Sequence, residues 1–170
     1  MEGADALGLI AEVGIAIAGF AGVIAALRAP GGKIGPYAAL RIGNLLGLSA
    51  TVVLLSLLPF AFHFGGLSSG AIWSLGSGSM TGLLVALALA PYTFLKGMRP
   101  TAREDLAPGV GRFQAVALTT HTLNVVLQII NVALIRQLWP FYVGLLILTA
   151  LSLVAFAYVL LFPSRSEVHA

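Results

Sequence analysis

Long apolar stretches alternate with short polar separators along the whole chain. Five stretches are long enough to form membrane-spanning helices, because a helix needs roughly 20 apolar residues to cross the hydrocarbon core of a bilayer. They cover about residues 7–27, 39–63, 71–95, 113–135 and 140–162, and glycine, proline, serine and charged residues gather between them. The pattern predicts an all-α integral membrane protein, in which residues 1–170 form a single transmembrane domain, a bundle of five helices.

The composition agrees with a lipid environment. Hydrophobic residues make up 59% of the 170-residue chain and charged residues only 9%, whereas soluble domains carry about 25% charged residues. The lipid bilayer is therefore the first partner that the sequence predicts, and the net charge of +3 does not indicate nucleic acid. The chain has no cysteine, which excludes disulfides and thiolate metal sites.

The basic residues predict how the helices are oriented. Lysine and arginine accumulate in cytoplasmic loops and are rare in short external ones. With the N-terminus outside and the C-terminus in the cytoplasm, eight of the 9 basic residues are cytoplasmic and only Arg136 is external. The eight are Arg28, Lys33, Arg41, Lys96, Arg99, Arg103, Arg112 and Arg165. An even number of spans would destroy this separation of the basic residues. We therefore expect five passes through a plasma membrane, namely a bacterial inner membrane.

Small residues recur every four positions in the first three stretches. This spacing places them along one face of a helix, where they let two helix backbones approach closely in lipid. The glycines of these ridges are Gly14, Gly22, Gly43, Gly47, Gly78 and Gly82. We expect them to pack the helices of one subunit together, with contact between subunits as the alternative. The fifth stretch carries no charge between Phe141 and Phe162, so we expect it at the lipid-facing perimeter.

The fourth stretch is the least apolar, because it carries an arc of polar side chains. On an ideal helix, these side chains share an arc of about 100°. They are Gln114, His121, Asn124, Gln128 and Asn131. Amides are too costly to face acyl chains without partners. They either hydrogen-bond to neighbouring helices or line a hydrated path for ions or small polar solutes.

Three charged residues within or beside the apolar spans, Glu12, Arg41 and Arg136, are candidates for a role in the membrane. Glu12 is the only acidic residue inside one of them, and such a group is a candidate functional site because it is costly in the bilayer. It either pairs with Asn131 or Arg136, or attracts ions or protons at an external mouth. Arg41 either extends to the lipid phosphates or forms a cytoplasmic gate or anion contact.

Motifs for catalysis are not found. The sequence contains no HExxH or P-loop pattern, and the apolar spans offer a single carboxylate. His63 and His121 fall at different depths, so they do not predict a shared haem. We expect no enzyme activity, no metal and no cofactor.

The leading functional hypothesis is a homo-oligomeric ion channel or other permeation path. Its lining is expected to include His121, Asn124, Gln128 and Asn131, and the chain is short for an alternating-access transporter. The alternative is a non-catalytic accessory, immunity, sensor or effector subunit, in which the same amides bind another membrane protein.

Overall fold

Almost all of the residues that the structure describes lie in helices. This computed structural model describes residues 3–27, 36–97 and 110–161, apart from the side chains at 36–37, 90–92, 94–95, 97 and 110–114. The helices in chain order are α1 (Ala4–Leu27), α2 (Pro36–Phe64), α3 (Ser69–Gly97), α5 (Val110–Ile130), the π-helix η2 (Asn131–Ile135) and α6 (Leu138–Leu161). Five helices, the fourth of them α5 continued by η2, are long and apolar enough to span a membrane. The predicted all-α, five-span pattern is confirmed, with helix ends within three residues of those expected.

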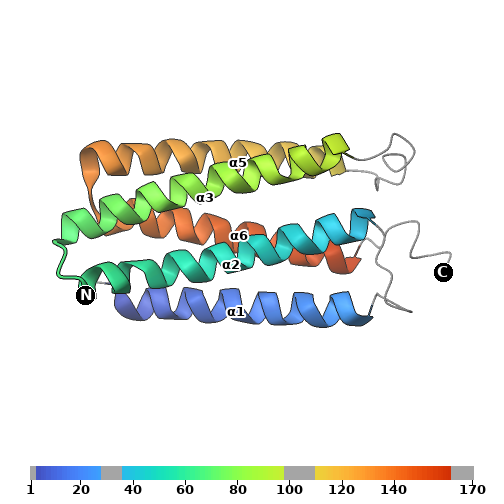
Figure 1. Cartoon of the computed structure of the whole chain (residues 1–170), viewed down its shortest axis with the longest axis horizontal. Coiled ribbons are helices and arrows are strands. Elements are labelled where there is room, and N and C mark those ends of the chain that lie inside the picture. The colour runs from blue at the N-terminus through green and yellow to red at the C-terminus, as the bar shows by residue number, and fades with distance from the viewer. Residues whose placement is uncertain (1–2, 28–35, 98–109, 162–170) are drawn as a thin grey trace.

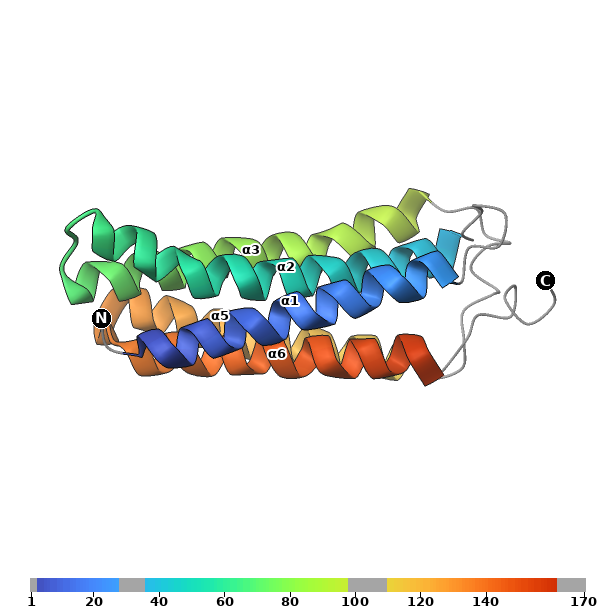
Figure 2. The same cartoon turned by 90° about the horizontal axis from the view of Figure 1, so that it is seen from below.

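The five long helices lie side by side along the length of the molecule (Figure 1). α2 and α3 lie on one side, α5 and α6 lie on the other, and α1 packs against α2 and α6 at the edge of this arrangement (Figure 2). The turn from α2 to α3 and the turn from η2 to α6 lie at the same end of the bundle as the N-terminus (Figure 1). Neighbouring spans therefore run in opposite directions along the axis.

α6 packs against four other helices and also keeps an outward face, at Leu146, Leu153 and Val154, so the expectation that it lies at the lipid-facing perimeter holds for that face alone. It packs against α1, α2, α3 and α5, and its buried residues include Gly144, Leu148 and Ser152. A helix without charged groups can be buried on every side as easily as it can face lipid. The absence of charge therefore says nothing about which of the two occurs. The helices with long outward faces are α1 and α5.

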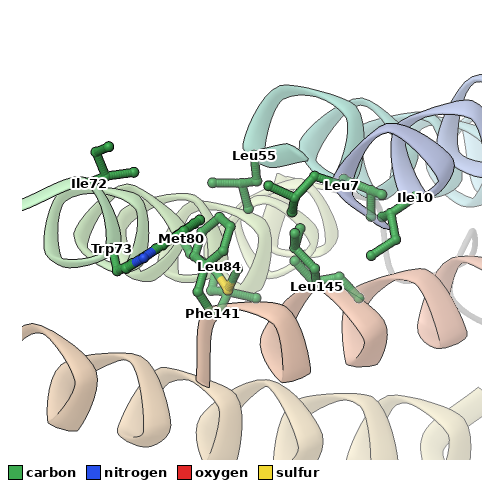
Figure 3. Close-up of a cluster of buried hydrophobic side chains, with 11 residues drawn as sticks. Leu7, Ile10, Leu55, Ile72, Trp73, Met80, Leu84, Phe141 and Leu145 are labelled. Atoms are coloured by element: carbon green, nitrogen blue, oxygen red, sulfur yellow. The ribbon is translucent and has the colours of Figure 1, made fainter. Parts of the chain in front are cut away.

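The largest apolar cluster joins four helices (Figure 3). Leu7 and Ile10 of α1 meet Leu55 of α2, Trp73 and Met80 of α3, and Phe141 and Leu145 of α6. The rings of Trp73 and Phe141 are 5.9 Å apart between centroids and tilted by 40°. Because lipid is as apolar as these side chains, close packing rather than removal from water stabilises the cluster.

Candidate functional site

Three amides of the predicted polar arc, on α5 and the following η2, face the interior of the bundle, where they meet a serine of α3. Asn131 donates from Nδ2 to Ser77 Oγ at 2.8 Å, and Ser77 Oγ donates to Gln128 Oε1 at 2.8 Å. Gln128 Nε2 in turn donates to Asn124 Oδ1 at 3.0 Å. We call these four residues, Ser77, Asn124, Gln128 and Asn131, the amide network. Each has at most 1% of its surface exposed, so the network is part of the interior.

The amide network also binds the backbone of α6. Asn124 Nδ2 donates to the carbonyl of Gly144 at 3.1 Å, and Gln128 Nε2 donates to that of Pro140 at 2.9 Å. The approach depends on the missing side chain of Gly144, because a Cβ there would lie 2.7 Å from both Asn124 Oδ1 and Met80 Sδ. Pro140 is tolerated because it lies in the first turn of α6, where its missing N–H has no helical partner to lose.

Asn131 closes the turn that leads from α5 to α6. Its Oδ1 accepts from the Gln137 N–H at 3.0 Å, and its Nδ2 donates to the Gln137 carbonyl at 3.1 Å. The Arg136 N–H donates to the Asn131 carbonyl at 2.9 Å, which completes the wider π-helical turn. Arg136 then adopts the left-handed conformation, with φ at 53°. One side-chain amide thus satisfies both backbone groups of Gln137 in a turn too short to satisfy them itself.

These bonds occupy most of the hydrogen-bond donors and acceptors of the amide network. In Gln128 and Asn131, both amide protons and the carbonyl oxygen form hydrogen bonds to other protein groups. Ser77 Oγ both donates and accepts. This is the arrangement expected if the amides hold helices together. Such bonds contribute about 0.6 kcal/mol each on average in membrane proteins, with a maximum near 1.7.

The other two residues of the predicted arc are not part of the amide network. His121 is half-buried, and its Nδ1 lies 2.8 Å from the carbonyl of Ala117 in the preceding turn. The side chain of Gln114 lies outside the described residues. The sequence did not single out Ser77 or Gly144 as partners of the arc. The sequence did contain one indication of the contact at Gly144, because it is the only glycine between residues 138 and 162.

The predicted glycine ridges divide between the interior and the outer surface. A Cβ on Gly14 would lie 2.9 Å from Val53, so this glycine brings α1 close to α2, and one on Gly47 would lie 3.4 Å from Leu87 of α3. A Cβ on any of the remaining four would meet no described residue within 4 Å, so these glycines mediate no close helix contact within the described part of the subunit. They are Gly22, Gly43, Gly78 and Gly82.

Glu12 lies on the outward face of α1, exposed, on the side opposite to the buried face of the helix. It does not pair with Asn131 or Arg136, and no hydrogen bond or ion pair joins it to another residue in the described part of the chain. Its position is about 12 Å from the start of a helix that is about 36 Å long, at 1.5 Å per residue. A carboxyl group therefore stands on a surface that is otherwise suited to acyl chains.

The residues on either side of Glu12 form a continuous stripe, which we call the α1 seam. Its members follow one another at alternating spacings of three and four residues, and all of them are exposed or half-buried. They are Asp5, Gly8, Glu12, Ile15, Gly19, Gly22 and Ala26. A Cβ on Gly8, Gly19 or Gly22 would meet no described residue within 4 Å. The seam is thus an outward face with two carboxyl groups, Asp5 in the first turn of α1 and Glu12 further along the helix.

Arg41 contacts the C-terminal end of α6. Its Nη2 donates to the Tyr158 carbonyl at 2.6 Å, and its guanidinium carbon lies 4.8 Å from the centroid of the Tyr158 ring. Tyr158 belongs to the last four residues of α6, whose carbonyls have no partner within the helix. The cation therefore stabilises the negative end of the α6 dipole. This contact joins α2 to α6 at the end of the bundle opposite the amide network.

The five helices are long and apolar enough to cross a membrane, which is the pattern of a multi-pass helical membrane protein. No family model, curated protein or solved structure matches the chain. Functional inference therefore depends on the residues themselves.

Proposed function

We propose that this protein is a non-catalytic membrane subunit that acts by assembling with another transmembrane helix through the α1 seam. The observation that carries the proposal is the outward position of Glu12. A charged side chain near the centre of a bilayer costs about 2.5–3.5 kcal/mol on insertion scales, and such groups almost always face other protein or water. A helix that covers the seam would remove Glu12 from lipid and offer it a partner.

The proposal includes the orientation expected from the basic residues. Arg41 near the start of α2 and Lys96 at the end of α3 share one end of the bundle, and Arg136 lies at the other. The excess of basic residues in the sequence supports a cytoplasmic location for the end with Arg41 and Lys96. The N-terminus is then external and the C-terminus cytoplasmic, in a bacterial plasma membrane. Glu12 belongs to the outer half of the bilayer.

Photo-cross-linking in native membranes tests the assembly. A photoreactive phenylalanine analogue replaces Ile15 in the seam or, as matched controls, Leu57 of α2 and Leu123 of α5, which are also outward-facing, with 50% and 65% exposure. We expect a discrete protein adduct from position 15 and only lipid adducts from the controls. Lipid adducts alone at position 15, or the same protein adduct from all three positions, would refute the proposal.

A second proposal keeps the permeation path but places it elsewhere. The amide network binds protein with most of its polar atoms, which favours a path between subunits over one along Asn124 and Gln128. If several copies surround an axis lined by α1, the Glu12 carboxylates form a ring that favours cations. Liposomes containing the protein should then pass potassium in preference to chloride, and Glu12→Gln should abolish that preference. Flux that depends on His121 and is indifferent to Glu12 would support the path lined by α5 instead.

A further inference from the structure

We infer that α5 enters the membrane together with α6, as one helical hairpin, and not as a separate span. Each of the three amides on α5 and η2 forms a hydrogen bond to the connecting turn or to the first two turns of α6. The inference concerns how the chain is inserted, and it goes beyond the assembly proposed above. It rests on the proposed orientation only, in which the turn between η2 and α6 is external.

The hydrogen bonds between the two helices follow one antiparallel register that is centred on Leu134. The paired residues are 6, 12 and 20 positions apart, so each pair lies at equal distances of 3, 6 and 10 residues on either side of this centre. The pairs are Asn131 with Gln137, Gln128 with Pro140, and Asn124 with Gly144. Bonds in one register can form in order, starting at the turn, as α6 follows α5 into the bilayer.

Without α6, the helix α5 would expose its amides to acyl chains. Lipid offers no hydrogen-bond partner, so each unsatisfied amide disfavours transfer into the membrane. α6 carries no charged side chain between Leu138 and Leu161, and an apolar helix of this length inserts readily. Insertion as a pair therefore satisfies the amides of α5 and adds the apolar surface of α6 in the same step.

Chain connectivity favours α6 over α3 as the partner of α5 during insertion. Only Arg136 and Gln137 separate η2 from α6, whereas residues 98–109 separate α3 from α5. A short connection keeps two antiparallel helices close together at a small cost in chain entropy. Within the described residues, α3 offers the amides a single hydroxyl, that of Ser77, which bonds to two of the three. We therefore expect α3 to dock onto a hairpin that has already formed.

Cysteine accessibility in the full-length chain tests the inference, because the natural chain has no cysteine. Gln137→Cys places a thiol in the exposed turn between η2 and α6, and its reaction with a membrane-impermeant maleimide is measured in sealed spheroplasts. Ser68→Cys is the control for topology, because the turn between α2 and α3 lies at the same end of the bundle (Figure 1). In the otherwise natural chain, we expect labelling from outside at both positions.

Gly144→Leu should prevent α5 and α6 from pairing, because even a Cβ at this position would collide with the side chains of Asn124, Gln128 and Met80. We expect the ratio of labelled to unlabelled thiol at position 137 to fall about tenfold or more, the equivalent of the two lost bonds. The ratio is counted over the protein present, so a lower yield does not change it. Labelling at position 68 should stay unchanged.

Two further variants show whether the effect comes from the amides. Adding Asn124→Leu and Gln128→Leu to Gly144→Leu should restore labelling at position 137, because α5 is then apolar enough to insert alone. Gly78→Leu on the outward face of α3 is the matched control and should have no effect, because a Cβ there meets no described residue within 4 Å. Failure of the two leucines to restore labelling would count against the inference.

Two other results would overturn the inference. If Gly144→Leu unfolds more easily but keeps full labelling at position 137, α5 inserts alone and bonds to α6 afterwards. If Ser77→Ala lowers the labelling as much as Gly144→Leu does, α5 depends on α3 instead. Labelling of position 68 from the inside alone would contradict the proposed orientation, and the same ratios at position 137 are then expected in inside-out vesicles. The photo-cross-linking at position 15 tests the α1 seam independently of all these results.

Discussion

Replacing Gly144 with alanine tests whether the amide network joins α5 to α6 as the structure describes. The new Cβ would lie 2.7 Å from Asn124 Oδ1 and 2.7 Å from Met80 Sδ, with Gln128 Nε2 also in its way. Carbon does not approach oxygen or sulfur so closely, so the two helices must separate or the amides must rotate. Either movement breaks the bonds from the amides to the backbone of α6.

The magnitude follows from three contributions. Adding a methyl group to a packed interior costs about 1–3 kcal/mol. Losing the bonds from Asn124 to Gly144 and from Gln128 to Pro140 costs about 0.6–1.7 kcal/mol each. Alanine also stabilises a helix by about 1 kcal/mol relative to glycine, which offsets part of the loss. We expect Gly144→Ala to lower the free energy of unfolding by about 1–5 kcal/mol.

The assay is reversible unfolding in mixed detergent micelles, monitored through the loss of tryptophan fluorescence and helicity. Gly78→Ala is the matched control, because a Cβ there meets nothing within 4 Å and the change should leave stability equal or raise it by up to about 1 kcal/mol. If Gly144→Ala unfolds at the same detergent fraction as Gly78→Ala, the close approach of α5 and α6 described here is wrong.

Three further changes test other contacts by the same unfolding measurement. Gln128→Leu should destabilise the protein by about 1–3 kcal/mol, because it leaves buried polar partners unsatisfied, and equal stability would show that the amide network contributes nothing. Gly14→Ala should destabilise by about 1–3 kcal/mol through contact with α2, whereas Gly22→Ala on the open face should not; similar effects of the two would contradict the assigned faces of α1. Arg41→Met should cost about 1–2 kcal/mol, because the charge-assisted bond to the Tyr158 carbonyl is lost, and a neutral result would place the arginine in lipid headgroups.

Helix positions could be predicted from the sequence because apolar length and turn residues determine them almost alone. In lipid, a segment is stable only when its backbone N–H and C=O groups are hydrogen-bonded within the protein. A long apolar stretch therefore has few alternatives to a helix. The polar arc was likewise visible, because Asn124, Gln128 and Asn131 recur at helical spacing. Their partner Ser77 was not, because spacing within one helix does not indicate which helix lies opposite.

The outward and inward faces of α1 also could not be predicted from residue spacing. Gly14 and Gly22 share one ridge in the sequence, yet Gly14 packs against α2 and Gly22 faces outward. Eight residues on an ideal helix turn by 800°, which is about 80° away from a whole number of turns. Spacing of four therefore drifts around the helix, and a ridge that begins inside can end outside. In a soluble protein, polarity would mark the difference, but here both sides of the helix are apolar.

Polar groups inside and outside this bundle have different consequences because lipid provides no hydrogen bonds. The amide network completes its bonds within one copy, so it stabilises each subunit at any concentration. Glu12 finds no partner within the described part of its own subunit, and in the proposed assembly its cost is reduced when another helix covers the α1 seam. Changes in the amide network should therefore alter unfolding and leave association intact. Changes at Glu12 should alter association and leave unfolding of the single subunit intact, because removing an outward carboxyl group breaks no bond within it.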